Sequence, residues 1–356
     1  ALISTMKRRN TILLSLALPA LWAFTAPAGE ISFHPEAGTT LTKSFDTTVE
    51  LSLDEMRMVM NGEEQDASMF GMEMSMTNSS ELEFTDTYVA VDGGRPTTLH
   101  RTFESLGNTT STSTSNQITG SMDLDVPSAS ELEGLTVVFA WEEDEGDFVA
   151  SYPEDAEGDE TLLEDLVEDT DLRGFLPRGA VEEGDTWTVE AAYLINLMAP
   201  GGDLKLIPEE MEEMPGMGDP TSELGIQDML GEIEGEVTCE YAGMREGLAA
   251  IKVTLEVSSA NDLSELIAEK MADAEMPQEG MEVSFDSMDV EVEIEGEGTL
   301  LWNVEAGHFA SFEFAGDMQQ VMEMAMAISS PMGEMDMEQT ITMSGNLNFV
   351  FEASEE

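Results

Sequence analysis

Apolar and polar residues alternate along most of this 356-residue chain, which is the pattern of strands with one buried face. Apolar residues occupy the odd positions over 49–53 and the even positions over 56–60. The change of phase at 54–55 predicts a β-bulge inside one long strand. Asn61-Gly62 follows directly and favours a reversal of the chain, so the next strand is expected to return alongside the first.

The same alternation recurs in many stretches that are joined by short turns, and this arrangement predicts an antiparallel sheet. Two stretches have helical spacing instead, Leu162–Val167 behind Asp159 and Leu263–Met271 behind Asp262, and each predicts a short helix. The remaining predicted strands cover residues 72–84, 87–92, 97–105, 117–125, 135–141, 186–198, 233–242, 248–257, 282–295, 300–304, 312–314 and 341–351.

Together these elements predict an all-β fold, a long curved antiparallel sheet with two short helices. Residues 107–116 form a low-complexity run of Gly, Asn, Ser and Thr, where we expect an exposed loop. Residues 199–231 are acidic and rich in Pro, Gly and Met, so they predict a loop or linker. This linker would separate an N-terminal β-rich lobe at 29–198 from a C-terminal β-rich lobe at 232–356, unless both form one continuous domain.

The first 28 residues have the features of a secretory signal peptide. Basic residues at 7–9 precede an apolar run at 12–24, and small residues at 26–28 match a cleavage site. The apolar run is too short to span a bilayer, and no cysteine at the cleavage site offers a point for lipidation. We therefore expect a periplasmic or extracellular protein without a stable membrane anchor.

Acidic residues dominate the charge of the chain. Asp and Glu total 75 against 13 Lys and Arg, which gives a formal net charge of −62. Such a charge repels nucleic acids and anionic lipid surfaces, so nucleic-acid binding is not expected. The chain is nevertheless 41% apolar, and this composition is typical of a folded protein rather than of a disordered acidic tail.

The usual signatures of enzymes are missing from the sequence. His34, His100 and His308 are isolated, and no zinc-binding spacing, nucleophile elbow, phosphate-binding loop or dinucleotide fingerprint occurs. Carboxylates are too numerous for the sequence to nominate a catalytic pair. We therefore expect a protein that is not an enzyme and that needs no cofactor.

Two acidic stretches and a single cysteine are further candidates for metal binding and for thiol reactivity. Residues 142–147 and 155–160 place carboxylates around a glycine, but neither matches the ligand spacing of an EF-hand, so calcium binding stays open. Cys239 shares a strand face with Val237 and Tyr241 and has no basic neighbour, which predicts a buried, unreactive thiol.

Methionine is the most unusual feature, with 27 in the chain, many at spacings of two residues that place their sulfurs on one face of a strand. Such rows would fill a loosely packed core, line a cavity for an apolar ligand of variable shape, or bind Cu(I) through their thioethers. Six of them are the candidate ligand-binding residues: Met56, Met58, Met60, Met72, Met74 and Met76.

One stretch resembles a known family. Leu176-Pro177, Val181 and the run from Gly184 to Trp187 are similar to the LP…V..GD.W signature of an uncharacterised family of secreted bacterial β-rich proteins. The resemblance implies a secreted β protein, with Gly184-Asp185 in a turn and Trp187 as a core anchor, and it carries over no catalytic residues.

The favoured architecture is a half-barrel similar to that of bacterial periplasmic lipoprotein carriers. Its concave face would be apolar, and the short helices would cover it as a lid. We therefore expect a binding or carrier protein for an apolar small molecule or lipid. The alternatives are a periplasmic copper-binding protein that uses the methionine rows, and a structural or surface protein without a small ligand; a protein partner is not identified.

Overall fold

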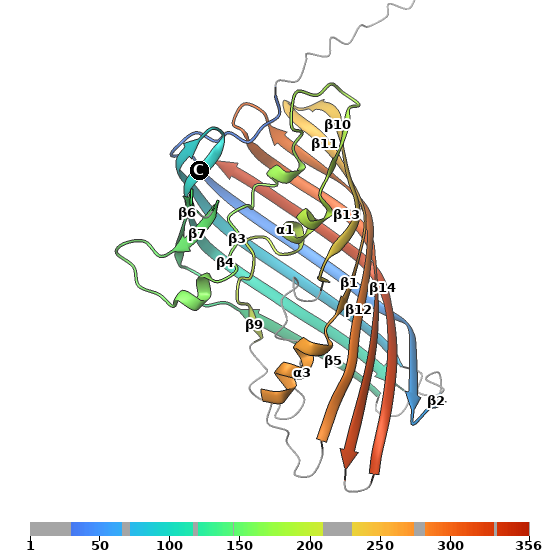
Figure 1. Ribbon diagram of the computed structural model, residues 1–356. Coiled ribbons are helices and arrows are strands. Elements are labelled where there is room, and N and C mark those ends of the chain that lie inside the picture. The colour runs from blue at the N-terminus through green and yellow to red at the C-terminus, as the bar shows by residue number, and fades with distance from the viewer. Residues whose placement is uncertain are drawn as a thin grey trace, which may run out of the picture.

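A computed structural model describes residues 30–65, 72–116, 120–144, 146–208, 230–273, 282–330 and 333–355. The predicted signal peptide at 1–28 and most of the predicted linker, residues 209–229, lie outside these ranges. One antiparallel sheet contains every strand of the described chain, and its main path has the order β7-β6-β4-β3-β1-β14-β13-β12-β11-β10-β8. Off this path, β2 pairs with β1, and β5 pairs with β4 and β9. Figure 1 shows this sheet curving around a hollow without closing on itself.

Six long strands form the middle of the sheet, and shorter strands flank them. The long strands are β1 (Thr40–Met60), β3 (Glu73–Asp92), β4 (Arg95–Asn116), β12 (Glu282–Asn303), β13 (His308–Ser330) and β14 (Gly333–Glu355). The shorter strands are β2 (Glu63–Gln65), β5 (Gly120–Ala129), β6 (Thr136–Glu142), β7 (Asp147–Ser151), β8 (Thr186–Val189), β9 (Ile207–Pro208), β10 (Ile233–Arg245) and β11 (Leu248–Asp262).

Helical segments are short. The α-helices are α1 (Ile195–Met198) and α3 (Ser264–Asp273), and the 3₁₀ turns are η2 (Glu160–Leu163), η3 (Arg173–Phe175) and η4 (Ala191–Leu194). No helix in the described ranges is long and apolar enough to cross a membrane. The predicted all-β fold, a long curved antiparallel sheet, is confirmed.

The first and last long strands lie side by side, so both halves of the chain build the same sheet. β1 pairs with β14 over its whole length, with Phe45 opposite Phe351. On its other side β1 pairs with β3, where Phe45 faces Leu82. Strands from both predicted lobes, 29–198 and 232–356, therefore share one hydrogen-bonded sheet.

Local features of β1 follow its sequence closely. The register against β14 shifts between Leu53 and Glu55, which confirms the predicted bulge. Asn61 and Gly62 have φ values of 51° and 76°, so they form the predicted reversal between β1 and β2. The apolar residues on either side of the bulge consequently stay on the same face of the sheet.

The loop predicted at 107–116 is wrong. These residues belong to β4, which lies between β3 and β5. Ser and Thr have adequate strand propensity, and polar cross-strand contacts replace the missing apolar ones. Asn78 Nδ2, for example, donates to Thr110 Oγ1 at 3.0 Å.

The strand predicted at 186–198 is only partly correct, because β8 ends at Val189 and the chain then turns into η4 and α1. Leu194 and Leu197 are buried there, with a spacing of three residues that suits helical turns. The helix predicted behind Asp159 is reduced to η2, although Asp159 does cap it by accepting from the Thr161 amide at 3.0 Å. The second predicted helix is α3.

Two glycines allow the backbones of β12 and β13 to approach each other closely within these long strands. Gly296 and Gly316 are directly opposite each other on β12 and β13. A Cβ on Gly296 would lie 2.6 Å from the Cα of Gly316, and a Cβ on Gly316 would lie 2.7 Å from the carbonyl oxygen of Glu295. No other residue fits this close approach of neighbouring backbones.

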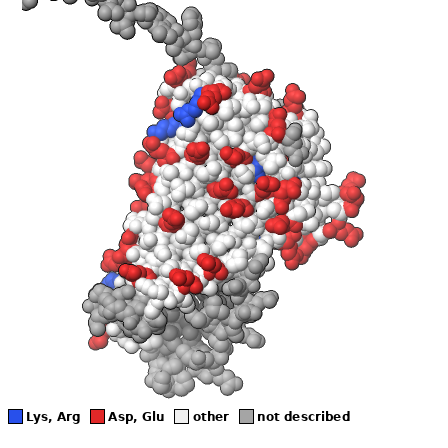
Figure 2. Space-filling model, turned by 180° about the vertical axis from the view of Figure 1, so that it is seen from behind, with Lys and Arg blue, Asp and Glu red and all other residues white. Residues whose placement is uncertain are grey.

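The two faces of the sheet differ strongly in polarity. The inner face, on which residues 152–206 pack, holds the aromatic core, including Phe45, Phe312 and Phe351. Seen from behind, the molecule shows many acidic and few basic side chains (Figure 2). One row of the outer face places carboxylates at directly opposite positions on four neighbouring strands: Glu236, Glu256, Glu295 and Asp317.

Replacing Gly316 by Val tests the role of the mid-strand glycines. The new side chain cannot avoid the Glu295 carbonyl without moving β12, so the free energy of unfolding is expected to fall by about 2–3 kcal/mol in urea titrations. The matched control is Ala315→Val on the exposed face of the same strand, which should leave stability nearly unchanged. Equal effects of the two substitutions would contradict this explanation.

Candidate functional site

Residues 152–206, which we call the covering segment, fill part of the hollow of the sheet (Figure 1). Phe175 of this segment is buried and stacks on Phe312 of β13 with 5.9 Å between ring centroids. Trp187 donates from Nε1 to the Phe175 carbonyl oxygen at 3.0 Å. Trp187 is half-buried against the core, and Gly184 with φ of 92° begins the turn before β8.

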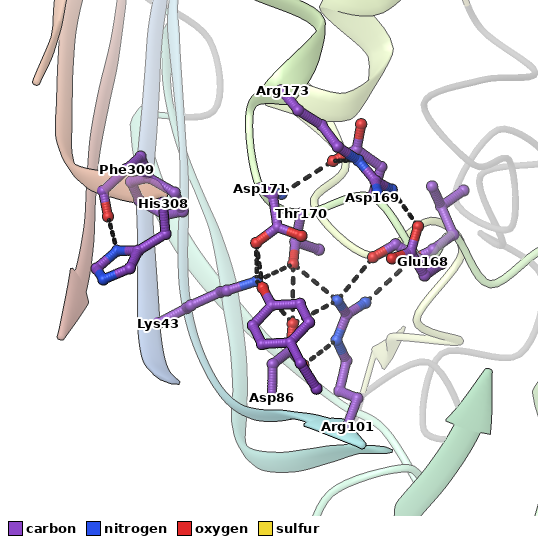
Figure 3. A network of polar contacts seen from close by, with 12 residues as sticks. Lys43, Asp86, Arg101, Glu168, Asp169, Thr170, Asp171, Arg173, His308 and Phe309 are labelled. Carbon is purple, nitrogen blue, oxygen red and sulfur yellow. Dashed lines mark hydrogen bonds and ion pairs between the residues drawn. The ribbon is translucent and has the colours of Figure 1, made fainter. Parts of the chain in front are cut away.

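A buried charge network fastens the covering segment to three neighbouring strands (Figure 3). Its members combine side chains of the inner face with side chains of residues 168–173, and all except Asp169 and Arg173 are nearly inaccessible to solvent. The network consists of Lys43 from β1, Asp86 and Tyr88 from β3, Arg101 from β4, and Glu168, Asp169, Thr170, Asp171 and Arg173 from the covering segment.

Lys43 lies at the centre of this network. Its Nζ is 2.7 Å from Asp86 Oδ2 and 2.6 Å from Asp171 Oδ1, so one ammonium joins two carboxylates. It also donates to the Tyr88 and Thr170 hydroxyls at 3.0 and 3.1 Å. Tyr88 in turn donates to Asp171, so the ammonium and the phenol hold the same carboxylate.

Arg101 makes the second connection between sheet and covering segment. Its Nε and Nη2 bind the two oxygens of Asp86 at 2.8 Å each, in the bidentate geometry that suits a carboxylate. Its Nη1 donates to the Val167 carbonyl at 2.9 Å, and Nη2 also lies 2.9 Å from the Glu168 carbonyl and 2.7 Å from the Thr170 hydroxyl. The guanidinium thereby satisfies backbone groups that the covering segment would otherwise bury without partners.

Opposing influences set the ionisation of the carboxylates. Burial alone would raise the pKa of Asp86, but the charges of Arg101 and Lys43 and their hydrogen bonds outweigh it and hold this pKa well below its usual range. For Glu168 burial dominates and raises the pKa to about 7. Arg173 lowers the pKa of Glu168 only in part, since Asp169 and Asp171 raise it.

The sequence analysis missed this network, although a signal for it exists. Lys43, between Leu41 and Phe45, interrupts the apolar phase of β1, and Asp86 does the same in β3. A charged residue in the buried phase of a strand requires a buried partner. Most members of the network are buried, and their contacts fasten the covering segment to the sheet.

Five of the six predicted methionines lie on the inner face of β1 and β3, and Met72 directly precedes β3. Met76 is opposite Leu51, and the row on β1 faces Ile341, Gln339 and Met337 of β14. Met72 is 39% exposed, and the other five are half-buried. The pairing of β1 with β3 ends at Ser52 and Ser75, so the two groups continue along separate strands beyond that point.

Additional methionines that were not among the six extend the row on β1 sideways. Inner-face rows of β14 and β13 are in register with the methionine row of β1. Met60, Met337 and Met326, for example, occupy directly opposite positions on the three strands. We call this surface the methionine face, and all its members are half-buried: Met56, Met58, Met60, Met322, Met324, Met326, Met335, Met337 and Ile341.

Helix α3 packs beside the methionine face, over β12. Leu263 donates its backbone N–H to the Met288 carbonyl at 2.8 Å, and the Ser264 hydroxyl accepts from the Met288 amide at 3.0 Å. Leu263 and Ile267 are buried, so the start of this helix covers the neighbouring part of the inner face. Met288 itself is only 2% exposed.

The cysteine and the three histidines lie in different parts of the fold. Cys239 is buried, as predicted, and burial raises the pKa of its thiol to about 12. His308 is buried near Phe309, whereas His34 is exposed and His100 is half-buried on β4. Within the described ranges, no group of three or more His, Cys, Asp or Glu side chains is arranged to hold a metal ion.

The protein consists of one β-sheet, a covering segment that buried ion pairs attach to this sheet, and a methionine-lined part of the inner face. No protein-family model matches the chain, and no curated protein matches it either. The similarity of residues 176–187 to the LP…V..GD.W signature therefore stays a prediction.

Glu168 is expected to make folding pH-dependent. Its pKa is about 7 in the folded protein against an ordinary value of 4.5, so the folded state binds this proton more tightly than the unfolded state. The free energy of unfolding should therefore fall by about 3 kcal/mol as the pH rises from about 4.5 to 7. Urea titrations of the protein and of Glu168→Gln at several pH values measure this, and the variant should lose most of the dependence.

Glu164→Gln is the matched control for Glu168→Gln, because Glu164 is exposed on the same segment. It should keep the pH dependence of the parent protein. The free energy of unfolding of the parent protein could instead stay constant or rise between about pH 4.5 and 7, with the same pH dependence in Glu168→Gln. That result would contradict the raised pKa of Glu168.

Proposed function

We propose that this protein is an extracytoplasmic binding or carrier protein for an apolar ligand such as a lipid, and that it performs no covalent chemistry. The observation that carries this proposal is the methionine face. Nine apolar side chains on three adjacent strands remain half-buried there, next to a core whose aromatic residues are fully enclosed. Gln339 is a polar side chain among them, opposite Met58 and Met324. An extended, largely apolar surface usually marks a binding site.

The chemistry of methionine supports an apolar ligand of variable shape. The side chain is unbranched and polarizable, so it adapts its surface to different partners at small cost. The rest of the inner face is rigidly built, because the buried charge network and the aromatic stacks hold the covering segment in place. A rigid inner face next to an adaptable methionine surface suits a carrier protein.

Helix α3 supports a role as a lid. It begins with two hydrogen bonds to Met288 and buries Leu263 and Ile267 on the inner face of β12. Its position at the border of the methionine face would allow a bound chain to pack between the helix and the strands.

Binding of a fluorescent fatty acid to the purified protein tests the proposal, together with native mass spectra that detect lipid-sized additions. The triple variant Met56→Gln, Met58→Gln and Met60→Gln makes the row on β1 polar with little change in volume. The affinity for the fatty acid should fall by about tenfold or more, because each Gln must lose water to contact the ligand.

Met244→Gln provides the control, because Met244 is 52% exposed on β10, away from the methionine face. It should leave the affinity unchanged. A protein that carries no lipid and does not bind the probe, or a triple variant that binds as well as the parent, would refute the carrier.

A specific observation also favours copper binding as a second candidate. Met60, Met337 and Met326 are directly opposite one another on three neighbouring strands, whose spacing is about 5 Å. Flexible thioethers at that spacing reach a common ion, and three soft sulfur ligands suit Cu(I).

Anaerobic titration with Cu(I) against a chromophoric competitor tests the copper site. Met337→Leu removes the central sulfur and keeps an apolar side chain, so Cu(I) affinity should fall by about a hundredfold while fatty-acid binding changes little. Met74→Leu, on β3, is the matched control. Equal copper binding by the parent and Met337→Leu would rule this site out, and a protein that binds neither probe would point to a structural role.

A further inference from the structure

A second concave site lies at the edge of the sheet and shares no residue with the methionine face. It is an open cleft of about 900 Å³ between β7 and the first part of the covering segment. This volume lies within the range of ligand-binding sites in proteins. The edge strand contributes residues 148–151 to one wall, directly followed by Tyr152, and residues 156–166 supply the other wall.

The wall formed by β7 presents free backbone groups. β7 ends the strand order of the sheet and pairs, within the described ranges, with β6 alone. The Phe148 amide donates to the side chain of Asp147 at 2.8 Å, so it points away from the β6 ladder. Because amides two residues apart on a strand point the same way, the Ala150 amide also points away from β6, toward the free edge of the sheet beside the cleft.

The opposite wall is held in a defined position. Tyr152 Oη donates to the Asp159 carbonyl at 2.8 Å, and Gly158 lies so close to the Tyr152 ring that no side chain would fit there. Further along, Leu166 forms a β-bridge with Gly202, next to the residues that Arg101 holds. The cleft is therefore built into the fold on both sides.

The lining of the cleft combines apolar and acidic side chains. Its apolar members pack against the protein core: Phe148, Ala150, Tyr152, Leu163 and Leu166. Four carboxylates belong to the wall opposite β7, namely Glu157, Glu160, Glu164 and Asp165, and no Lys or Arg lines the cleft among the described residues.

We propose that this cleft binds an extended, cationic peptide segment, which adds to β7 as a further strand. The unpaired edge supplies main-chain hydrogen bonds, which is the basis of strand addition in other peptide-binding proteins. The apolar lining accepts alternate side chains of such a segment, and the carboxylates attract its basic ones. The site goes beyond the proposed carrier function and does not depend on it.

Charge decides among the possible occupants of this edge. A second copy of this chain would bring its own formal charge of −62 to a cleft lined by four carboxylates. Self-association through β7 is therefore disfavoured by repulsion. A basic segment of another protein has the complementary charge and the free backbone that the edge strand requires.

Fluorescence anisotropy with a labelled octapeptide of alternating Arg and Val tests the proposal on the full-length protein at physiological salt. A peptide of the same sequence, N-methylated at alternate residues, keeps the charge but cannot pair with an edge strand. The N-methylated peptide is expected to bind about tenfold more weakly, or worse, because it loses its main-chain hydrogen bonds.

Two charge-matched variants separate the cleft from general attraction to an acidic protein. Glu157→Gln, Glu160→Gln and Glu164→Gln together should weaken peptide binding by about tenfold. Glu291→Gln, Glu293→Gln and Glu295→Gln remove three exposed carboxylates from the outer face of β12, and binding should change little. Thermal unfolding of both variants confirms that each is folded.

A third variant examines the edge strand itself. Ala150→Pro removes the amide at the free edge and leaves the hydrogen bonds between β7 and β6 intact. The affinity for the unmodified peptide should therefore fall by about tenfold. The proposal is overturned if the N-methylated peptide binds as tightly as the parent peptide. It is equally overturned if the two triple variants weaken binding to the same extent, since the peptide would then adsorb to the acidic surface in general.

Discussion

The rest of the structure depends on one set of buried ion pairs, in which Lys43 contacts Asp86 and Asp171 and Arg101 contacts Asp86. They join three strands of the sheet to the covering segment, which in turn encloses the aromatic core. Removing charges from water is costly unless every partner is present, and breaking one such pair costs about 3–5 kcal/mol. The network therefore holds the segment in one position.

The burial of these basic side chains also affects the charge of the protein surface. Lys and Arg total only 13, and the network takes Lys43, Arg101 and Arg173 from that small number. The outer face keeps rows of acidic side chains, such as the row that contains Glu256 and Glu295, and few basic ones (Figure 2). The protein is therefore electrostatically complementary to cationic partners and repels copies of itself.

The methionine face and the cleft beside β7 arise from opposite properties of one sheet. The first is an adaptable apolar surface on the inner face of β1, β14 and β13, which pair with one another along their length. The second exists because the sheet stays open and leaves an edge with free backbone groups. An apolar ligand and an extended peptide would thus use different parts of the molecule, which share no residue.

By itself the sequence determined the strands, the bulge at 54–55 and the inward direction of the methionines, because period-two alternation is a local property. It misassigned 107–116, since polar strands lack that signal, and it missed the network. Only the tertiary structure decided that Lys43 meets Asp171, 128 residues away, and that Met60 stands beside Met326 and Met337. Register and long-range pairing depend on the whole sheet, which no local pattern encodes.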